Sequence, residues 1–384
     1  MIIKRVKLKN WRNFQSVDVE LKDRVFLIGP NASGKSNFLD VFRFLRDIAK
    51  SNGGLEQAVK DRGGIPKIRY LPARREQDIE IEVYILDKKE SINWKYAIGI
   101  RQEKSVNRKA FLVYEKVFRN DEELLSRPDS ADKVDPLRLT QTHLEQTYAN
   151  FEFRKIAGFF ESIVYFHLIP QVIKYSDNFS KPNLKGDPFG RNFLESIAET
   201  NSKIRDSRLK RIEKALQKVV PQLKDLQRVQ DEYGYTHLGI TYEHWRPNAG
   251  KQTEEELSDG TLRLIALLWS VLDGDSLLLL EEPELSLHIS IVRLIPDLIS
   301  KIQIEMKKSR QIIISTHSPE LLSSKGISGE EVLLLKPDEN GTNIETANSR
   351  EDVRVLIEEG VPVGEAAFPK TKPSNIEQLL LFND

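Results

Sequence analysis

The chain has 384 residues, of which 39% are hydrophobic and 30% are charged. This length and composition support one large domain with a subdomain, or two domains, and exclude wholesale disorder. Lysine and arginine number 58, as do aspartate and glutamate, which excludes a histone-like basic coat but not a local basic patch. Because there is no cysteine, disulfides, thiolate zinc sites and iron–sulfur clusters are excluded as well.

The sequence has no features of a membrane protein. Residues 1–10 carry charges inside their apolar run and lack a small-residue cleavage site, unlike a signal peptide. The longest apolar runs, Leu264–Leu272 and Leu277–Leu280, are too short to span a bilayer. We therefore expect a cytoplasmic protein without a membrane partner.

The N-terminal part predicts strands followed by a helix. Alternating apolar residues predict strands in the first thirty positions, and the last of these, Arg24–Ile28, has the pattern of a buried parallel strand. A helix is predicted from about Lys35, with four apolar residues on one face: Phe38, Leu39, Phe42 and Leu45. Residues 50–77 are Gly-rich and basic, which predicts a loop, and residues 79–85 and 94–100 predict an antiparallel pair of strands.

The middle of the chain is less regular. Residues 119–150 are polar with little periodicity, and we interpret them as an insertion. Residues 190–230 predict helix with a kink at Pro221, because six apolar residues keep a helical spacing: Leu209, Ile212, Leu216, Val219, Leu223 and Leu226. Residues 235–245 return to a strand pattern.

The C-terminal part predicts an α/β block and a tail. Its predicted helices lie at 260–272 and about 290–307, and its predicted strands at 276–280, 311–315 and 331–335. Residues 362–375 are rich in Pro and Lys, which predicts a flexible linker to a short apolar end at 376–382.

The segment Gly29–Ser36 matches the phosphate-loop pattern G-x-x-x-x-G-K-[ST]. Its glycines let successive N–H groups point at phosphate oxygens, and the helix that follows presents its positive N-terminal end. Lys35 is predicted to reach the β- and γ-phosphates, and the Ser36 hydroxyl to bind Mg²⁺. The segment also lies between an apolar strand and an amphipathic helix, which is the context that this motif requires.

Two carboxylates, Glu281 and Glu282, directly follow the apolar run Leu277–Leu280. Side chains at the C-terminal end of a buried strand emerge where open α/β sheets bind ligands. We assign Glu281 to Mg²⁺ and Glu282 to the general base that activates the attacking water. The alternative is a solvated acidic loop after a core strand.

Two further segments precede predicted helices. In Leu257–Thr261, Ser258 or Asp259 is expected to cap the helix, and Ser258 and Gly260 have the residue types to bind a γ-phosphate. After the strand at 311–315, His317 is a candidate sensor of the γ-phosphate, while Ser318 is expected to cap a helix with Pro319 in its first turn.

Together these motifs resemble the ATP-binding-cassette-type ATPases, and more narrowly the branch of SMC, RecF and OLD-type proteins. The resemblance rests on five stretches, at 7–16, 25–40, 257–261, 277–288 and 312–322. It implies an α/β P-loop head, with a mixed sheet core and an antiparallel β subdomain, that is split by a mainly helical insertion. The expected parts are residues 1–118 and 231–345 of the head, the insertion 119–230, and a C-terminal helix and tail at 346–384.

The resemblance also implies ATP and Mg²⁺ as cofactors and a homodimer with two ATP molecules between its heads. Each Leu257–Thr261 segment would serve the partner's ATP, and Leu285–His288 would lie at the dimer contact. The expected catalytic residues are Lys35, Glu282 and His317. The expected nucleotide-binding residues are Arg12, Gly29, Pro30, Asn31, Ala32, Ser33, Gly34, Lys35, Ser36, Asn37, Ser258 and Gly260.

The sequence departs from the family pattern at three positions. Ala32 and Asp259 stand where glycine is usual, and Glu281 stands where aspartate is most common. The family also uses a glutamine to couple the metal to the insertion, and Gln57 is a candidate by position. Because the chain ends soon after the head, we expect no fused nuclease, so any cleavage would need a separate effector protein.

Weaker signals concern the partners. Basic residues near Tyr70 are candidate DNA contacts, although a solvated loop would have the same composition: Arg62, Lys67, Arg69, Arg74 and Arg75. The end of the chain resembles peptides that bind the bacterial sliding clamp through Gln378, Leu381 and Phe382, and the alternative is a terminal helix on its own domain.

The function expected from these observations is a dimerising ATPase that acts on DNA or a partner effector in DNA repair, DNA maintenance or anti-phage defence. One alternative is a nucleotide-gated scaffold or sensor with little turnover. The other is the nucleotide-binding subunit of a membrane transporter.

Overall fold

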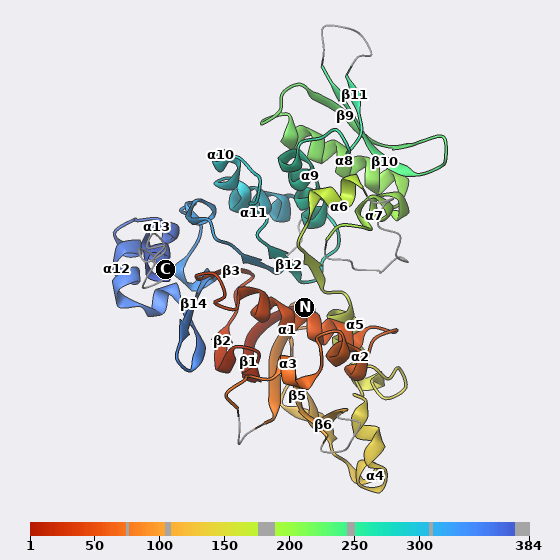
Figure 1. The fold of residues 1–384 in the computed structure, drawn as a ribbon, viewed down its shortest axis with the longest axis vertical. Helices are drawn as coiled ribbons and strands as arrows, with labels where there is room; N and C mark the ends of the chain where they lie inside the picture. Colours follow the sequence, from red (N-terminus) through yellow and green to blue (C-terminus); the bar gives the residue numbers. More distant parts are fainter. Residues whose placement is uncertain (74–76, 104–108, 176–188, 244–249, 307–309, 373–384) are drawn as a thin grey trace, which may run out of the picture. The chain divides into compact units, whose positions relative to one another are not determined.

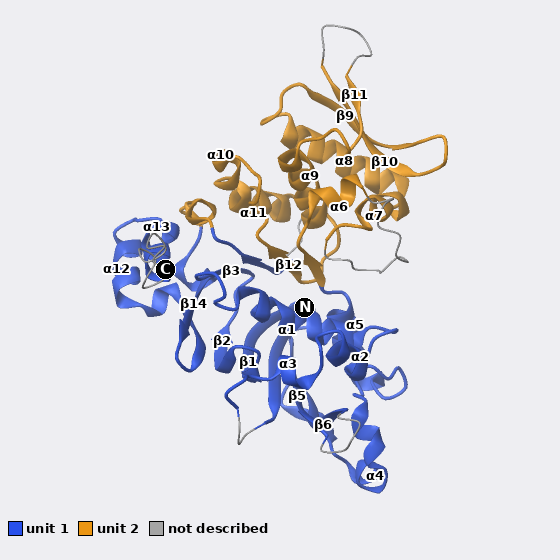
Figure 2. Ribbon diagram, in the orientation of Figure 1, with its two compact units in different colours: residues 1–163, 310–317, 327–384 blue, residues 164–309, 318–326 orange. Residues whose placement is uncertain are grey.

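The chain divides into two units, which are described separately (Figure 2). Unit 1 comprises Met1–Ile163, Arg310–His317 and Ile327–Asp384, and unit 2 comprises Val164–Ser309 and Ser318–Gly326. The computed structural model describes residues 1–73, 77–103, 109–175, 189–243, 250–306 and 310–372 (Figure 1).

One sheet of unit 1 is antiparallel throughout and has the strand order β2-β1-β4-β5-β6-β7. Its strands are β1 (Ile2–Trp11), β2 (Phe14–Glu20), β4 (Ile79–Asp87), β5 (Ile92–Gln102), β6 (Ala110–Arg119) and β7 (Glu122–Arg127). The predicted pairing of 79–85 with 94–100 is confirmed, with Ile81 opposite Ile98. Alternate residues of β4 are buried, as expected for a strand with one face on the core.

The other strands of unit 1 hold the phosphate loop. In the order β15-β14-β3-β13, β3 (Arg24–Ile28) pairs in parallel with β13 (Ile312–Ser315) and β14 (Val332–Asp338), and β15 (Gly341–Thr346) is antiparallel to β14. The predicted buried parallel strand is confirmed. Helix α1 (Lys35–Ala49) follows β3, and its aromatic residues pack on each other and on the β1–β2 turn, with Trp11 and Phe44 ring centroids 5.2 Å apart.

Two predictions for irregular structure in unit 1 are wrong. The predicted loop at 50–77 contains α2 (Leu55–Lys60) and α3 (Ile65–Ile68), each entered through a glycine with positive φ and each with apolar residues in the core. The predicted linker from Pro362 begins with α13 (Val363–Ala367), in which Val363, Ala366 and Ala367 are buried. In both segments a few apolar side chains are buried in the folded unit, which composition does not show.

The remaining helices of unit 1 are short. The α-helices are α4 (Ser130–Val134), α5 (Arg154–Glu161) and α12 (Glu351–Glu358), and the 3₁₀ helices are η1 (Pro136–Thr140), η2 (Phe151–Phe153), η5 (Gly329–Glu331), η6 (Ala347–Ser349) and η7 (Phe368–Thr371). Arg127, at the end of β7, has no exposed side-chain area and bonds to Glu115 and Asp132, which are equally buried. This network fixes the segment after β7 to the sheet.

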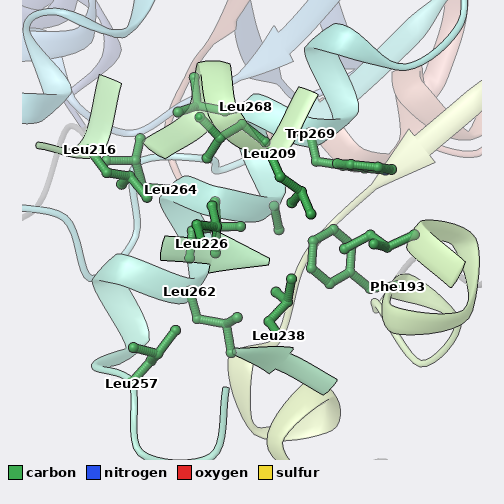
Figure 3. Close-up of a cluster of buried hydrophobic side chains, with 14 of the residues drawn as sticks. Phe193, Leu209, Leu216, Leu226, Leu238, Leu257, Leu262, Leu264, Leu268 and Trp269 are labelled. Carbon is green, nitrogen blue, oxygen red and sulfur yellow. The ribbon is translucent and has the colours of Figure 1, made fainter. Parts of the chain in front are cut away.

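Unit 2 contains two small strand groups and most of the longer helices. Strand β8 (Val164–Phe166) pairs in parallel with β12 (Leu278–Glu281), and β9 (Leu223–Gln230), β10 (Thr236–Tyr242) and β11 (Lys251–Gln252) form an antiparallel sheet. The helices are α6 (Pro170–Lys174), α7 (Phe193–Glu199), α8 (Ser202–Leu216), α9 (Asp259–Leu272), α10 (Ile289–Val292), α11 (Ile295–Glu305) and the 3₁₀ helix η4 (Pro319–Leu322). Side chains of α7, α8, α9, β9 and β10 form one hydrophobic core (Figure 3).

The predicted helix at 190–230 is wrong at its C-terminal end, because α8 stops at Leu216 and residues 223–230 form β9. Leu223 and Leu226 are both buried although they lie three positions apart. The cause is a β-bulge, in which Asp225 has a φ of 55° and one extra residue of β9 faces β10. The bulge gives this strand the spacing of a helix.

Candidate functional site

The predicted phosphate loop joins β3 to α1 in unit 1. A Cβ atom on Gly29 would lie 2.6 Å from the carbonyl oxygen of Leu335, and one on Gly34 would lie 2.2 Å from Nδ2 of Asn13. Gly34 also has a φ of 97°, so both positions require glycine. Helix α1 has no side-chain cap and no acidic residue in its first turn. Its N-terminal N–H groups and the positive end of its dipole therefore suit an anion.

Lys35 and Ala32 have distinct conformations in this loop. The Lys35 ammonium donates to the carbonyl oxygens of Gly29 and Pro30 at 2.9 and 3.0 Å, so it lies at the loop where a phosphate would accept its bonds. Ala32, which stands where the family has glycine, has a φ of 61°. An alanine in this left-handed region costs roughly 1–2 kcal/mol, so the departure adds strain without changing the path of the backbone.

The turn between β1 and β2 supports the loop. Asn13 donates to the carbonyl oxygen of Ser33 at 3.0 Å and accepts from the Asn37 amide at 2.7 Å, and Trp11 Nε1 donates to the Asn37 carbonyl at 2.9 Å. This turn therefore fixes both ends of the loop from Ser33 to Asn37. The sequence analysis selected Arg12 and Asn37 as nucleotide-binding residues but missed Asn13. The hint in the sequence was that Asn13 directly follows Arg12.

Arg12 belongs to a charge network on α1. It has a φ of 50° and donates to Asp40 at 2.5 Å. The same carboxylate accepts from Arg62, which also donates to Asp47 at 2.9 Å. Burial alone would raise the pKa of Asp40, but Arg62 and Arg12 lower it on balance, so the carboxylate stays ionised.

The predicted DNA contacts differ in their exposure. The Arg62 side chain is only 6% exposed, and its guanidinium is occupied by Asp40 and Asp47 rather than presented to solvent. Lys67 on α3 is exposed and Arg69 is half-buried. Arg74 and Arg75 lie outside the described residues, as do the tail residues Gln378, Leu381 and Phe382.

In unit 2, Glu281 ends β12 beside the end of β8. Leu279 lies opposite Tyr165 in the parallel register, and the Tyr165 hydroxyl donates to the Glu281 carboxylate. His167 Nδ1 lies 3.3 Å from the Glu281 carbonyl oxygen. Sequence reasoning missed Tyr165 and His167 because they precede Glu281 by more than 110 positions and belong to no motif. Glu282 is half-buried and has a φ of 45°, a strained conformation for this residue type.

The segment Leu257–Thr261 leads into α9, which begins at Asp259. Ser258 is the N-cap, since its hydroxyl accepts the Thr261 N–H at 3.2 Å, as predicted. A Cβ atom on Gly260 would lie 2.6 Å from the carbonyl oxygen of Ser286, so glycine is needed where α9 meets the segment that follows Glu282. Unit 2 therefore brings the segment Leu257–Thr261, which we call the signature, together with Leu285–His288.

Three further candidates lie on other segments of the chain. His317 is exposed directly after β13 in unit 1. Ser318 occupies the N-cap of η4 ahead of Pro319, but its side chain bonds to the Glu320 side chain and makes no capping bond. Gln57 lies on α2 and its exposed amide donates to Asp61 at 2.5 Å.

Two absences can be stated for the residues that the structure describes. Within the six described ranges, no three His, Asp or Glu side chains lie close enough to bind a metal ion by themselves. A protein that binds Mg²⁺ together with phosphates needs only one or two oxygen ligands of its own. Across the same ranges, no helix has the length and hydropathy to cross a membrane.

One protein-family model matches most of the chain. Residues 24–323 match the family described as "AAA domain, putative AbiEii toxin, Type IV TA system". The chain belongs to this AAA family. No curated protein matches this AAA protein at a significant level.

Solved structures of other proteins have a similar fold. This AAA protein is similar to the Smc head bound to the C-winged helix domain of ScpA, with a TM-score of 0.54 and 13% identity over 90% of this chain and 98% of that one. It is also similar to an Smc head domain with an extended coiled coil bound to the C-terminal domain of ScpA derived from Pyrococcus furiosus, with a TM-score of 0.53 and 12% identity over 93% and 99% of the two chains. The predicted α/β P-loop fold, similar to that of Smc heads, is confirmed.

Proposed function

We propose that this AAA protein binds and hydrolyses ATP, dimerises around it, and acts on DNA or a partner effector in DNA repair, DNA maintenance or anti-phage defence. The observation that carries the proposal is the phosphate loop Gly29–Ser36 at the uncapped N-terminus of α1, within a chain of the AAA family. The other motifs of the ATP-binding-cassette-type pattern follow this loop in the expected order along the chain: Leu257–Thr261, Glu281–Glu282 and His317.

In this proposal, Gly29–Ser36 holds the phosphates, and Lys35 exchanges its bonds to the loop carbonyls for bonds to the β- and γ-phosphates. Ser36 and Glu281 supply oxygen ligands of the type that Mg²⁺ prefers. Bound Mg²⁺ would offset the charge that develops on the phosphates. Glu282 accepts a proton from the attacking water, and His317 contacts the γ-phosphate.

The proposed dimer offers Ser258 and Gly260 of each copy to the ATP of the other. Exposed apolar side chains beside the signature support this contact, since Leu285 is 41%, Ile289 47% and Leu294 56% exposed. Exposed apolar side chains gain free energy when a protein partner covers them. Both Smc heads named above are bound to domains of ScpA, and by analogy we propose a protein partner of this chain, either an effector such as a nuclease or a sliding clamp bound by the tail.

For DNA, we propose Lys67 and Arg69, together with Arg74 and Arg75, as contacts to backbone phosphates. The test is binding of double-stranded DNA by the Lys67→Ala and Arg69→Ala variants across a range of salt concentrations. Loss of affinity with a shallower salt dependence supports these contacts, and unchanged binding excludes them.

The decisive experiment measures ATP turnover and oligomeric state together, with and without double-stranded DNA. Glu282→Gln is expected to keep ATP bound and form a stable dimer, Lys35→Ala to lose ATP binding, and the exposed control Glu232→Gln to behave like the wild type. DNA is expected to raise wild-type turnover. If all three variants bind ATP as the wild type does, and ATP does not change the oligomeric state of any of these proteins, the proposal is refuted.

A second candidate is a nucleotide-gated scaffold with little turnover. It is favoured by the Tyr165 hydroxyl, which donates to one oxygen of the Glu281 carboxylate and would compete with a metal ion for that oxygen. Tight ATP binding and ATP-driven dimerisation with negligible phosphate release would select this candidate. The family match and the likeness to Smc heads give the transporter alternative no support.

A further inference from the structure

Asp259 places a negative charge inside the segment that the proposed function assigns to a phosphate. It lies between Ser258 and Gly260 in the first turn of α9. An aspartate there stabilises the helix through the helix dipole. The same carboxylate would repel the γ-phosphate that a second copy brings to this helix end. A residue that offsets this charge is therefore needed if the signature is to receive ATP.

Helix α6 supplies that residue. The Lys174 ammonium donates to one carboxylate oxygen of Asp259 at 2.7 Å, and the Gln171 amide donates to the other at 2.6 Å. The Lys174 side chain is 14% exposed and that of Asp259 is 35% exposed, so solvent screens the pair only in part. The hydrogen bond from Lys174 also lowers the pKa of Asp259, so the carboxylate stays ionised.

Arg263, one turn further along α9, does not replace Lys174. It is buried, and burial lowers the pKa of its guanidinium, while the charges of Asp259, Glu284 and Glu282 all act on it in the opposite direction. Lys174 forms its ion pair with Asp259 directly.

We propose that Lys174 neutralises Asp259 and, with Gln171, holds its carboxylate aside, so that Ser258 and Gly260 can accept the γ-phosphate of ATP bound to a second copy. Lys174 is in this sense a positioning residue for the signature, and the inference rests on the proposed function. Only three residues separate β8 from α6, and β8 carries the Tyr165 hydroxyl that holds Glu281. One short segment, Tyr165–Lys174, therefore contacts both the metal-site carboxylate and the signature.

The test is a double-mutant cycle in the full chain that carries Glu282→Gln. Lys174→Met, Asp259→Gly and the pair of substitutions are compared for ATP binding by the monomer and for the ATP concentration that gives half-maximal dimer in analytical ultracentrifugation. Lys174→Met is expected to raise that concentration about tenfold or more, because a like charge is left facing the phosphate. Monomer affinity for ATP is expected to stay unchanged, since Lys174 serves the other copy's nucleotide.

Adding Asp259→Gly to Lys174→Met is expected to restore dimerisation, because it removes the charge that Lys174 offsets. The defect of Lys174→Met should also shrink at high salt. Lys203→Met, at an exposed lysine of α8, is the matched control and should change nothing.

Normal dimerisation of Lys174→Met overturns the inference, as does a failure of Asp259→Gly to rescue it in a variant whose thermal melt matches the parent. If Glu282→Gln alone binds ATP but does not dimerise, the proposed function itself fails and this inference fails with it.

Discussion

Replacing Asp40 with asparagine is expected to destabilise unit 1 by about 3 kcal/mol. The carboxylate is 8% exposed and is bonded to Arg12 and Arg62, whose side chains are 24% and 6% exposed. The estimate takes the lower end of the range for breaking a buried ion pair, because Arg62 keeps its bond to Asp47. For a unit of about 150–250 residues, the melting temperature should fall by roughly 6–12 °C.

The destabilisation caused by Asp40→Asn should become smaller as the pH falls. The pKa of folded Asp40 lies below its ordinary value of 3.8. The ionised carboxylate therefore stabilises the folded unit above about pH 4, and this contribution is lost as the pH falls further. The difference between the wild type and Asp40→Asn should accordingly shrink below about pH 4.

Differential scanning calorimetry at neutral pH measures the shift, and hydrogen exchange in α1 and α2 locates it. Asp18→Asn is the matched control, because Asp18 also pairs with an arginine through both oxygens, but the two side chains are 42% and 44% exposed. That exposed pair should contribute less than about 1 kcal/mol. If Asp40→Asn is as mild as Asp18→Asn, the network does not stabilise the phosphate-loop helix and the reasoning is refuted.

Three other predictions follow from single contacts. Tyr165→Phe removes the hydroxyl that donates to the Glu281 carboxylate. In steady-state kinetics, kcat and the Mg²⁺ concentration that gives half-maximal kcat should each change about tenfold or more. Nucleotide titration should show little change in the affinity for ATP. Gly260→Ala places a Cβ atom 2.6 Å from the Ser286 carbonyl and should impair ATP-driven dimerisation in ultracentrifugation while the monomer stays folded. Arg127→Met leaves two carboxylates buried without a cation and should cost about 3–5 kcal/mol in denaturant unfolding, and a loss below 1 kcal/mol would contradict this.

The phosphate loop could be predicted because its chemistry is contiguous. Gly29–Ser36 are neighbours in sequence, and the strand before them and the helix after them have strong periodic patterns. The same holds for the carboxylates at the end of β12 and for Ser258 at the start of α9, since a strand end and a helix cap are local features.

Local pattern was misleading where tertiary contacts override it. The bulge at Asp225 gave a strand the apolar spacing of a helix. The basic stretch around Arg62 gave no indication that its guanidinium is buried between Asp40 and Asp47, because ion pairing depends on residues that the fold brings in from 15 and 22 positions away.

Local sequence patterns therefore predicted the P-loop fold, the order of the motifs and the candidate phosphate-binding residues, because each is encoded by adjacent residues or by one repeating pattern. Only the tertiary structure revealed the residues that support them. Asn13 braces the loop from 20 positions away, Tyr165 reaches Glu281 across 116, and Lys174 reaches Asp259 across 85. Such contacts are set by strand register and helix packing, which no local stretch of the chain specifies.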